Sequence, residues 1–224
     1  MKVKEKLMME LDDLKKNGPV NIVFFGDSIT HGSVNGYRDY ENVYWNVLKK
    51  MFNSFRDLIP VNVIDAGIGG TTATESLSRI DSQVLSHNAD LIVVCFGLND
   101  INDSLEQFLN SLKQIFLKCQ SHADVIYMTP NMFNTYVADD TPKELIEQAC
   151  NLSEFQNSGK MDMYMDKARE LAQSVGVKVC DCYSKWKTLS ENEDTTLLLA
   201  NRTNHPIPEM HKLFAQSLYE IIME

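Results

Sequence analysis

Five short apolar runs recur along the chain and set its overall pattern. They read IVFFG from residue 22, VNVIDAG from 61, LIVVCFG from 91, VIYMTP from 125 and VKVCDC from 177. The runs are rich in β-branched residues, and several are almost continuously apolar rather than alternating. That pattern is typical of strands that are covered on both faces. We therefore expect five buried β-strands.

Longer segments with a helical spacing of apolar residues lie between these runs. In residues 41–55, for example, Val43, Val47, Leu48 and Met51 fall on one helical stripe. Three further segments are also predicted to be helical: 104–119, 160–176 and 207–224. The alternation of strands and helices predicts an α/β fold. We expect a three-layer α/β/α sandwich with a five-stranded parallel sheet in the flavodoxin-like order 2-1-3-4-5.

One segment, residues 131–158, interrupts this alternation. It contains Thr141 and Pro142, a pair typical of a helix N-cap followed by proline in the first turn. We expect a short helical excursion over the carboxyl ends of the strands. It is either a lid or pocket wall, or simply a surface connection. The chain shows no repeat or linker, so residues 1–224 are predicted to form a single domain.

The composition excludes several classes of protein. With 44% hydrophobic and 23% charged residues, the 224-residue chain is typical of one globular domain. A formal net charge of −10 and the lack of a Lys/Arg cluster argue against a nucleic-acid partner. No stretch is apolar enough to span a bilayer, so we expect no membrane insertion. The five cysteines lack metal-ligand spacing, and their odd number without an export signal favours a cytoplasmic protein. The sequence leaves open whether the protein forms a homo-oligomer.

Small and polar residues follow the first three predicted strands. The sequence GDSIT begins at residue 26, GIGGTT at 67 and GLND at 97. Ligands of an open parallel sheet bind beyond the carboxyl ends of its strands, so Ser28, Gly70 and Asn99 are expected around one point. Ser28 alone is compatible with a nucleophile, a phosphate-binding residue or a helix cap, and Asp27 with a helix N-cap. A hydroxyl beside amide donors is what acyl transfer requires, because its tetrahedral intermediate carries an oxyanion.

A serine nucleophile also needs a base, and the chain has five histidines. His87 and His122 precede predicted strands and belong to the opposite edge of the sheet. His31 follows the serine closely, and His211 lies inside the last predicted helix. His205 is placed best, because just before that helix the chain returns to the carboxyl edge of the sheet.

Four blocks of the sequence resemble a known family. FFGDSIT, DAGIGG, GLND and NHP, the last followed by His211, resemble the four blocks of the SGNH (GDSL-type) hydrolases, which are serine esterases and lipases. The resemblance covers nearly the whole chain, and the blocks occur in the family's order. It implies Ser28 as nucleophile and His205 as general base and acid. It also implies an oxyanion hole made by the N–H groups of Ser28 and Gly70 and the side chain of Asn99. This chemistry requires no metal or organic cofactor.

The sequence departs from the family at one position. The family usually carries an aspartate three residues before the histidine, where this chain has Arg202. An arginine cannot accept the imidazole N–H or stabilise the imidazolium. The partner of His205 is therefore the carbonyl of Arg202, the amide oxygen of Asn201, or Asp194 folding back. We favour a Ser–His dyad with a carbonyl partner.

These observations predict a serine ester hydrolase that acts on a small-molecule ester through an acyl-enzyme intermediate. Nothing marks a long acyl tunnel, so we expect short acyl groups, such as O-acetyl groups of carbohydrates. A lipase, a lysophospholipase and a thioesterase of the same family are alternatives. Two alternative hypotheses place the protein outside the hydrolases. One is a flavodoxin-like flavin-binding protein that holds a phosphate in its GDSITHGS loop, and the other is a catalytically silent relative that only binds a ligand.

Overall fold

The computed structural model describes residues 2–224 and contains a five-stranded sheet. Its strands are all parallel and lie in the order β2-β1-β3-β4-β5, which confirms the predicted order. The strands are β1 (Val20–Gly26), β2 (Val61–Gly67), β3 (Leu91–Cys95), β4 (Asp124–Met128) and β5 (Lys178–Cys180). Each apolar run of the sequence therefore supplies one strand.

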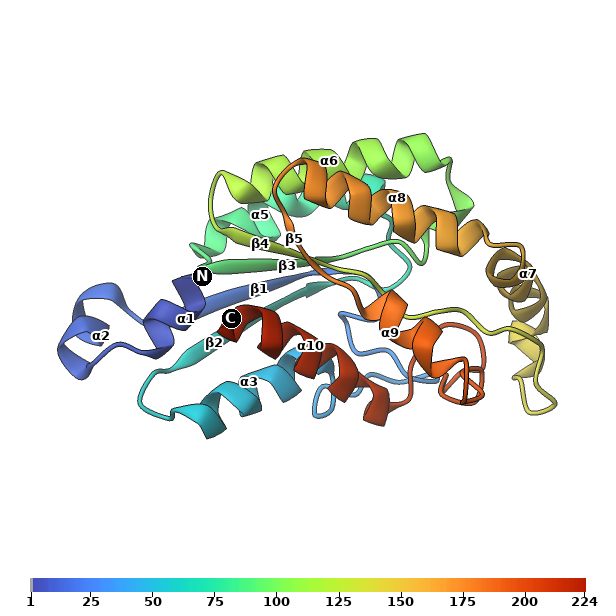
Figure 1. The fold of residues 1–224 in the computed structure, drawn as a ribbon, viewed down its shortest axis with the longest axis horizontal. Coiled ribbons are helices and arrows are strands. Elements are labelled where there is room, and N and C mark those ends of the chain that lie inside the picture. The colour runs from blue at the N-terminus through green and yellow to red at the C-terminus, as the bar shows by residue number, and fades with distance from the viewer. Residues whose placement is uncertain (1) are drawn as a thin grey trace.

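Helices cover both faces of this sheet. The helices are α1 (Lys2–Leu7), α2 (Leu11–Asn17), α3 (Tyr44–Phe55), α4 (Ala73–Ser76), α5 (Ile80–Gln83), α6 (Leu105–Gln120), α7 (Ile146–Asn157), α8 (Lys160–Ser174), α9 (Cys182–Leu189) and α10 (His211–Met223). Helices α3 and α10 pack together on one face, and α5, α6 and α8 lie on the other (Figure 1). This arrangement is the predicted three-layer α/β/α sandwich.

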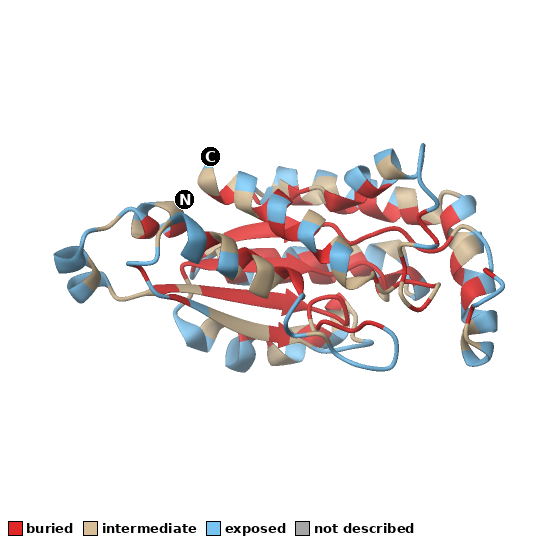
Figure 2. Cartoon of the chain, turned by 90° about the horizontal axis from the view of Figure 1, so that it is seen from below, coloured by how far each residue is buried: buried red, intermediate tan, exposed pale blue. Residues whose placement is uncertain are grey.

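The core lies on both sides of the central strands (Figure 2). All five residues of β3 are buried, and in β1 only Asn21 is partly exposed. β2 is an edge strand, and Asn62 in it is exposed. The continuous apolarity of the central runs thus reflects burial under helices on both faces.

The helix after β1 begins later than its apolar stripe predicts, at Tyr44 instead of residue 41. Its buried side chains are Tyr44, Leu48 and Phe52, spaced four residues apart, so they form one face of the helix. Val47 and Met51 of the predicted stripe are only partly buried and flank that face.

The turn after β1 differs from the expected helix start. The first helix after this strand is α3, so Asp27 caps a turn and not a helix. The Asp27 Oδ1 atom accepts the N–H of Ile29 at 2.9 Å, as in an Asx turn. The indole of Trp45 on α3 fixes the same turn, because its Nε1 donates to the carbonyl of Thr30 at 2.9 Å.

Two features hold this turn against the neighbouring strand. A Cβ at Gly67, the last residue of β2, would lie only 2.5 Å from the backbone nitrogen of His31, so the close approach requires glycine. Arg79 Nη1 donates to the carbonyl of Ala66 at 2.6 Å, and its Nη2 donates to that of Gly26 at 3.0 Å. The carboxyl ends of β1 and β2 are therefore tied together.

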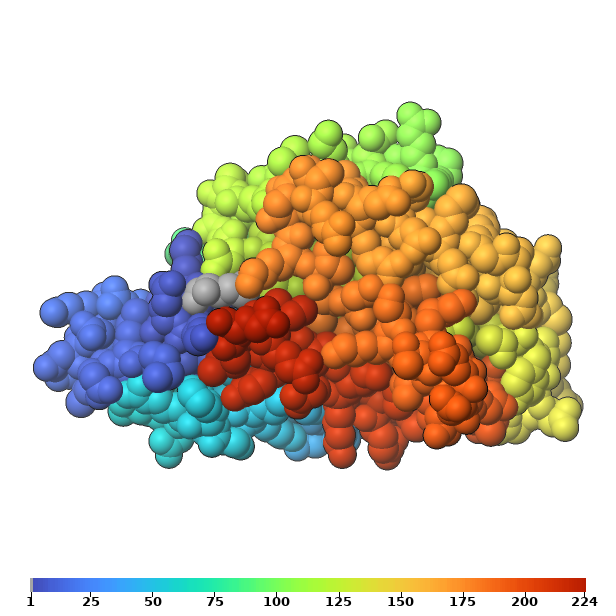
Figure 3. All heavy atoms as spheres, in the orientation of Figure 1, coloured from blue at the N-terminus to red at the C-terminus, as the bar shows by residue number. Residues whose placement is uncertain are grey.

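The excursion at 131–158 lies at the end of the molecule opposite α2 (Figures 1 and 3). Its helical part is a 3₁₀ turn at Lys143–Leu145, which follows Pro142, and then α7. That it acts as a lid stays a prediction. Among residues 2–224, no helix combines the length and apolar character that crossing a bilayer requires.

Candidate active site

Ser28 and His205 meet at the carboxyl edge of the sheet. Ser28 lies in the turn after β1, and His205 lies in the loop before α10. The Ser28 Oγ and His205 Nε2 atoms are 3.0 Å apart, although 177 positions separate the two residues in the sequence. Ser28 is 7% exposed, so the hydroxyl is largely withdrawn from solvent while still lining a cleft.

The other imidazole nitrogen contacts a backbone carbonyl. His205 Nδ1 lies 2.9 Å from the carbonyl oxygen of Val34. Because a carbonyl oxygen can only accept, Nδ1 must carry the proton, and Nε2 is then free to accept the hydroxyl proton of Ser28. Val34 lies in a hairpin turn in which its N–H donates to the carbonyl of Tyr37 at 3.0 Å. The turn therefore fixes the tautomer that a general base requires.

The loop that carries His205 is organised by one side chain. The Asn201 Oδ1 atom accepts the backbone N–H groups of Thr203, Asn204 and His205 at 3.1, 3.1 and 2.9 Å. Asn201 is buried, so these bonds form away from solvent. The amide oxygen of Asn201 thus holds the backbone of the loop, and it is not the partner of the imidazole.

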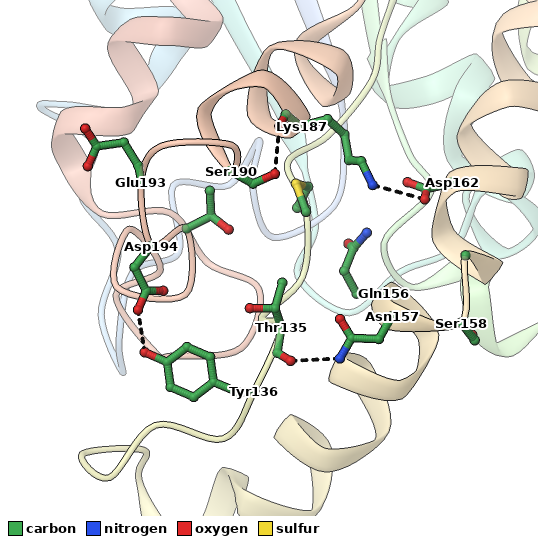
Figure 4. A pocket seen from close by; sticks show the side chains of 13 residues that line it. Thr135, Tyr136, Gln156, Asn157, Ser158, Asp162, Lys187, Ser190, Glu193 and Asp194 are labelled. Atoms are coloured by element: carbon green, nitrogen blue, oxygen red, sulfur yellow. Dashed lines mark hydrogen bonds and ion pairs between the residues drawn. The ribbon is translucent and has the colours of Figure 1, made fainter.

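The other two expected partners, the carbonyl of Arg202 and the carboxylate of Asp194, form no hydrogen bond with the imidazole, whose two nitrogens contact Val34 and Ser28. The Arg202 guanidinium binds Asp140 of the excursion, with its Nε 2.9 Å from Oδ1 and its Nη2 2.8 Å from Oδ2. Asp194 accepts the hydroxyl of Tyr136 at 2.6 Å (Figure 4). A carbonyl partner was expected, but the carbonyl is that of Val34, so the expectation that Arg202 supplies it was wrong.

Three potential hydrogen-bond donors lie near the hydroxyl. The backbone N–H groups of Ser28 and Gly70 donate to no other group among residues 2–224. Gly70 has a φ of 81°, a conformation that favours glycine. The Asn99 Nδ2 atom donates to the carbonyl of Thr71 at 3.0 Å and lies 3.5 Å from Asp27 Oδ2, so its second hydrogen is only weakly held.

The Ser28–His205 pair lies in a cleft of about 630 Å³. It is lined by the turn after β1, the residues after β2, Asn99, the loop before α10, and Glu144, Leu145 and Gln148 of the excursion. Most of the side chains that line it are polar, but its exposed surface is divided about evenly between polar and apolar atoms. Its aliphatic side chains are those of Val34, Ile68 and Leu145.

Burial controls the electrostatics of the site. Desolvation lowers the pKa of His205 below its ordinary value, the carbonyl of Val34 opposes this shift, and the positive charge of Arg38 adds to it. Burial also raises the pKa of the Asp27 carboxyl to about 7, and the negative charge of Asp100 adds to this increase. The imidazole is therefore kept neutral at physiological pH.

A second hollow of about 570 Å³ lies beside α7 and α9 (Figure 4). It contains Asp162, whose Oδ2 pairs with Lys187 Nζ at 3.1 Å, and the bonded pair of Asp194 and Tyr136. No histidine lines this hollow.

Ser28, Gly70, Asn99 and His205, which the sequence singled out, all line the first cleft. The sequence reasoning missed the carbonyl of Val34, because every residue carries a carbonyl and none marks its direction. It also left Arg38 aside, although that cation lines the same cleft.

The fold and its buried serine–imidazole contact define a class of protein, the α/β/α ester hydrolases. The chain belongs to the GDSL-like lipase/acylhydrolase family, because the family's sequence model matches residues 24–213. The resemblance seen in the sequence is thus confirmed, and the family is one of carboxylic ester hydrolases.

Solved structures share this fold. The acetylxylan esterase Axe2 of Geobacillus stearothermophilus superposes with a TM-score of 0.70 at 18% identity, over 91% of this chain and 94% of that one. The acetyl xylan esterase AlAXEase superposes with a TM-score of 0.70 at 22% identity, over 91% of this chain and all of that one (100%). At these identities, the likeness is one of fold.

Two curated relatives match only in part. An uncharacterised protein of Mycoplasma pneumoniae is 27% identical over 156 residues, which are 66% of this chain and 16% of that protein. The uncharacterised lipoprotein YqeF of Bacillus subtilis is 36% identical over 85 residues, which are 37% of this chain and 33% of that protein. The match thus spans a third or less of either relative.

Proposed function

We propose that the protein hydrolyses short-chain acyl esters, with O-acetyl groups of carbohydrates as the preferred class, through an acyl-enzyme on Ser28. The observation that carries this proposal is the 3.0 Å contact between Ser28 Oγ and His205 Nε2 inside the cleft. In the first step, Ser28 Oγ attacks the ester carbonyl carbon while its proton passes to Nε2. The C–O bond to the alcohol then breaks, and the Nε2 proton goes to the departing alcohol oxygen.

The second half of the reaction repeats these roles with water. His205 takes a proton from water, which attacks the acyl carbon, and the proton then returns to Ser28 Oγ as the acid leaves. In both halves the oxyanion is stabilised by the free N–H groups of Ser28 and Gly70 and by the second hydrogen of Asn99 Nδ2. Donors that are already in place need no reorganisation when the charge develops.

The small number of aliphatic side chains in the cleft, those of Val34, Ile68 and Leu145, supports a short acyl group. A long acyl chain would need an extended apolar wall, because each buried CH₂ contributes about 0.8 kcal/mol. The cleft instead carries carboxylate, amide and guanidinium groups from Glu144, Gln148 and Arg38, which suit a polar alcohol. Two solved structures of the same fold are acetylxylan esterases, and this adds support for an acetyl ester as the substrate. A cytoplasmic location remains a prediction.

The test compares 4-nitrophenyl acetate, butyrate and palmitate, and then measures acetate release from acetylated xylo-oligosaccharides. We expect the rate to fall with acyl length and to vanish in Ser28→Ala and His205→Ala. Ser54→Ala and His122→Ala are matched controls on the exposed surface and should behave like wild type. Faster turnover of palmitate would refute the short-chain assignment. Turnover that survives Ser28→Ala would refute the nucleophile, and a wild type without turnover would favour a silent binding relative.

A further inference from the structure

One arginine in the active-site cleft has no ionic partner. The chain has five arginines. Arg56, Arg169 and Arg202 pair with carboxylates, and Arg79 donates to two backbone carbonyls. Arg38 forms no ion pair with residues 2–224, and its two hydrogen bonds, to His31 Nδ1 and to the carbonyl of Tyr37, are both 3.5 Å long. Its five N–H donors are thus almost unused.

Arg38 lies close to the nucleophile. A Cβ built on Gly69 would be 3.8 Å from Arg38 Nη2 and 3.6 Å from the Cβ of Ser28, so both side chains border the same point. An antiparallel bridge between Ser33 and Arg38 fixes the backbone of this turn. The guanidinium is therefore presented to the cleft by an ordered turn.

The position of Arg38 indicates which part of an ester it would meet. The turn that carries Arg38 also provides the Val34 carbonyl that binds His205, and the charge of Arg38 acts on that imidazole. His205 must lie beside the departing alcohol in order to protonate it. A group bound by Arg38 would therefore lie in the same cleft as the departing alcohol.

We propose that Arg38 binds an anionic group, a carboxylate or a phosphate, on the alcohol part of the ester substrate. The preferred substrate is then an acylated acidic sugar and not a neutral one. A planar guanidinium with free donors matches both anions through paired hydrogen bonds. In a protein with a net charge of −10, an unpaired cation beside the nucleophile offsets the general repulsion of an anionic substrate. This inference rests on the proposed hydrolase function.

The exposed rings of Tyr37 and Tyr40 flank Arg38 in the sequence. Tyr40 is oriented by His31, because its hydroxyl lies 3.1 Å from His31 Nε2. Neither tyrosine lines the cleft itself, but His31 Nδ1 also lies 3.5 Å from Arg38 Nε, so one imidazole joins the half-exposed Tyr40 ring to the guanidinium. The Tyr40 ring favours a sugar as the carrier of the anion.

The experiment compares isosteric acetate esters that differ in charge. The probes are a singly O-acetylated methyl glucuronoside, its neutral carboxamide, and a singly O-acetylated methyl glucoside 6-phosphate. Acetate release is measured at about pH 8.5, where a His205 imidazole of lowered pKa is neutral with or without Arg38. The readout is the ratio of kcat/KM for each anionic ester to that for the carboxamide.

We expect wild type to favour an anionic ester, and Arg38→Gln to lower that ratio about tenfold, since charged hydrogen bonds are lost. Arg38→Lys should restore part of the ratio, and Lys113→Gln on the exposed face of α6 should leave it unchanged. The larger ratio identifies carboxylate or phosphate as the bound group. An equal loss on charged and neutral esters in Arg38→Gln, or no preference for either anion in wild type, would overturn the proposal.

A binding measurement separates this proposal from the hydrolase assignment. Calorimetry on Ser28→Ala records binding of the same esters without turnover. Tighter binding of an anionic ester that disappears in Ser28→Ala/Arg38→Gln supports the anion site even if wild type hydrolyses nothing. Equal binding of charged and neutral esters overturns it even if the enzyme is active.

Discussion

Lowering the pH should stop hydrolysis only when His205 becomes protonated, and burial makes that protonation difficult. The pKa of this imidazole is lowered from the ordinary value of 6.5, chiefly by desolvation. The Val34 carbonyl accepts the Nδ1 proton at 2.9 Å but carries no full charge to stabilise an imidazolium. The neutral base should therefore persist to lower pH than in a site with a carboxylate partner.

The expected size of the effect follows from the ordinary pKa of 6.5 and the lowered pKa of His205. An imidazole with a pKa of 6.5 is half neutral at pH 6.5, so one with a lower pKa is more than half neutral there. More than half of the plateau in kcat/KM should thus remain at pH 6.5. A carboxylate partner would raise the pKa by about 1–3 units, and the half-maximal point would move up by the same amount.

The assay is the kcat/KM for 4-nitrophenyl acetate between about pH 4.5 and 9, which reports groups of the free enzyme. Asp27 needs a control, because burial raises the pKa of its carboxyl to about 7. Asp27→Asn keeps an oxygen for the N–H of Ile29 and removes this titration. Its half-maximal point should stay below pH 6.5. In Arg38→Gln, the half-maximal pH should be higher than in wild type, because the positive charge of Arg38 lowers the pKa of His205.

A half-maximal point at or above pH 7 that persists in Asp27→Asn would refute the reasoning. It would mean that a negative charge stabilises the imidazolium, and the dyad with a carbonyl partner would be wrong. A point near pH 7 that falls below 6.5 in Asp27→Asn would instead assign the titration to Asp27.

Four further substitutions test other parts of the structure. Asn99→Ala should lower kcat about 10²–10³-fold on 4-nitrophenyl acetate with little change in KM, and an unchanged kcat would remove this amide from the oxyanion hole. Asp194→Ala should keep most of the activity that His205→Ala loses, and an equal loss in both would restore Asp194 as the orienting acid. Gly67→Ala places a Cβ 2.5 Å from a backbone nitrogen, so both the melting temperature and the activity should fall, and wild-type values for both would contradict the tight packing. Burial raises the pKa of Asp100 to about 7, so its contribution to stability is complete below the unfolded value of 3.8 and is lost as the pH rises through 7. Asp100→Asn should therefore gain stability relative to wild type between about pH 4 and 7, by at most about 1.4 kcal/mol per pH unit, and parallel unfolding curves at all pH values would argue against this titration.

The order of the strands could be predicted because each strand is a separate apolar run. β3 is buried on both faces, and its sequence LIVVC is uniformly apolar as a result. The convergence of Ser28, Gly70 and Asn99 was also predictable, because residues after neighbouring parallel strands share one edge of the sheet. Both inferences rest on local composition and on the direction of the chain.

The turn geometry and the partner of His205 could not be predicted in this way. Asp27 and Ser28 suit a helix cap and an Asx turn equally well, and the turn that forms is held by tertiary contacts such as the hydrogen bond from Trp45 to the Thr30 carbonyl. The Val34 carbonyl contacts an imidazole 171 positions away, and nothing in the residue type of Val34 signals that contact. Backbone acceptors are selected by tertiary structure.

The ion pair between Arg202 and Asp140 connects the loop that carries His205 to the excursion, which also lines the cleft. Asn131 adds a second fastening, since its Nδ2 donates to the carbonyl of Asn204 at 2.9 Å. Substitutions in the excursion would consequently shift the position of His205 without contacting it. Substrate preference would then change while Ser28 and His205 stay the same. If this excursion were transferred to another esterase, an arginine equivalent to Arg202 would have to be transferred with it.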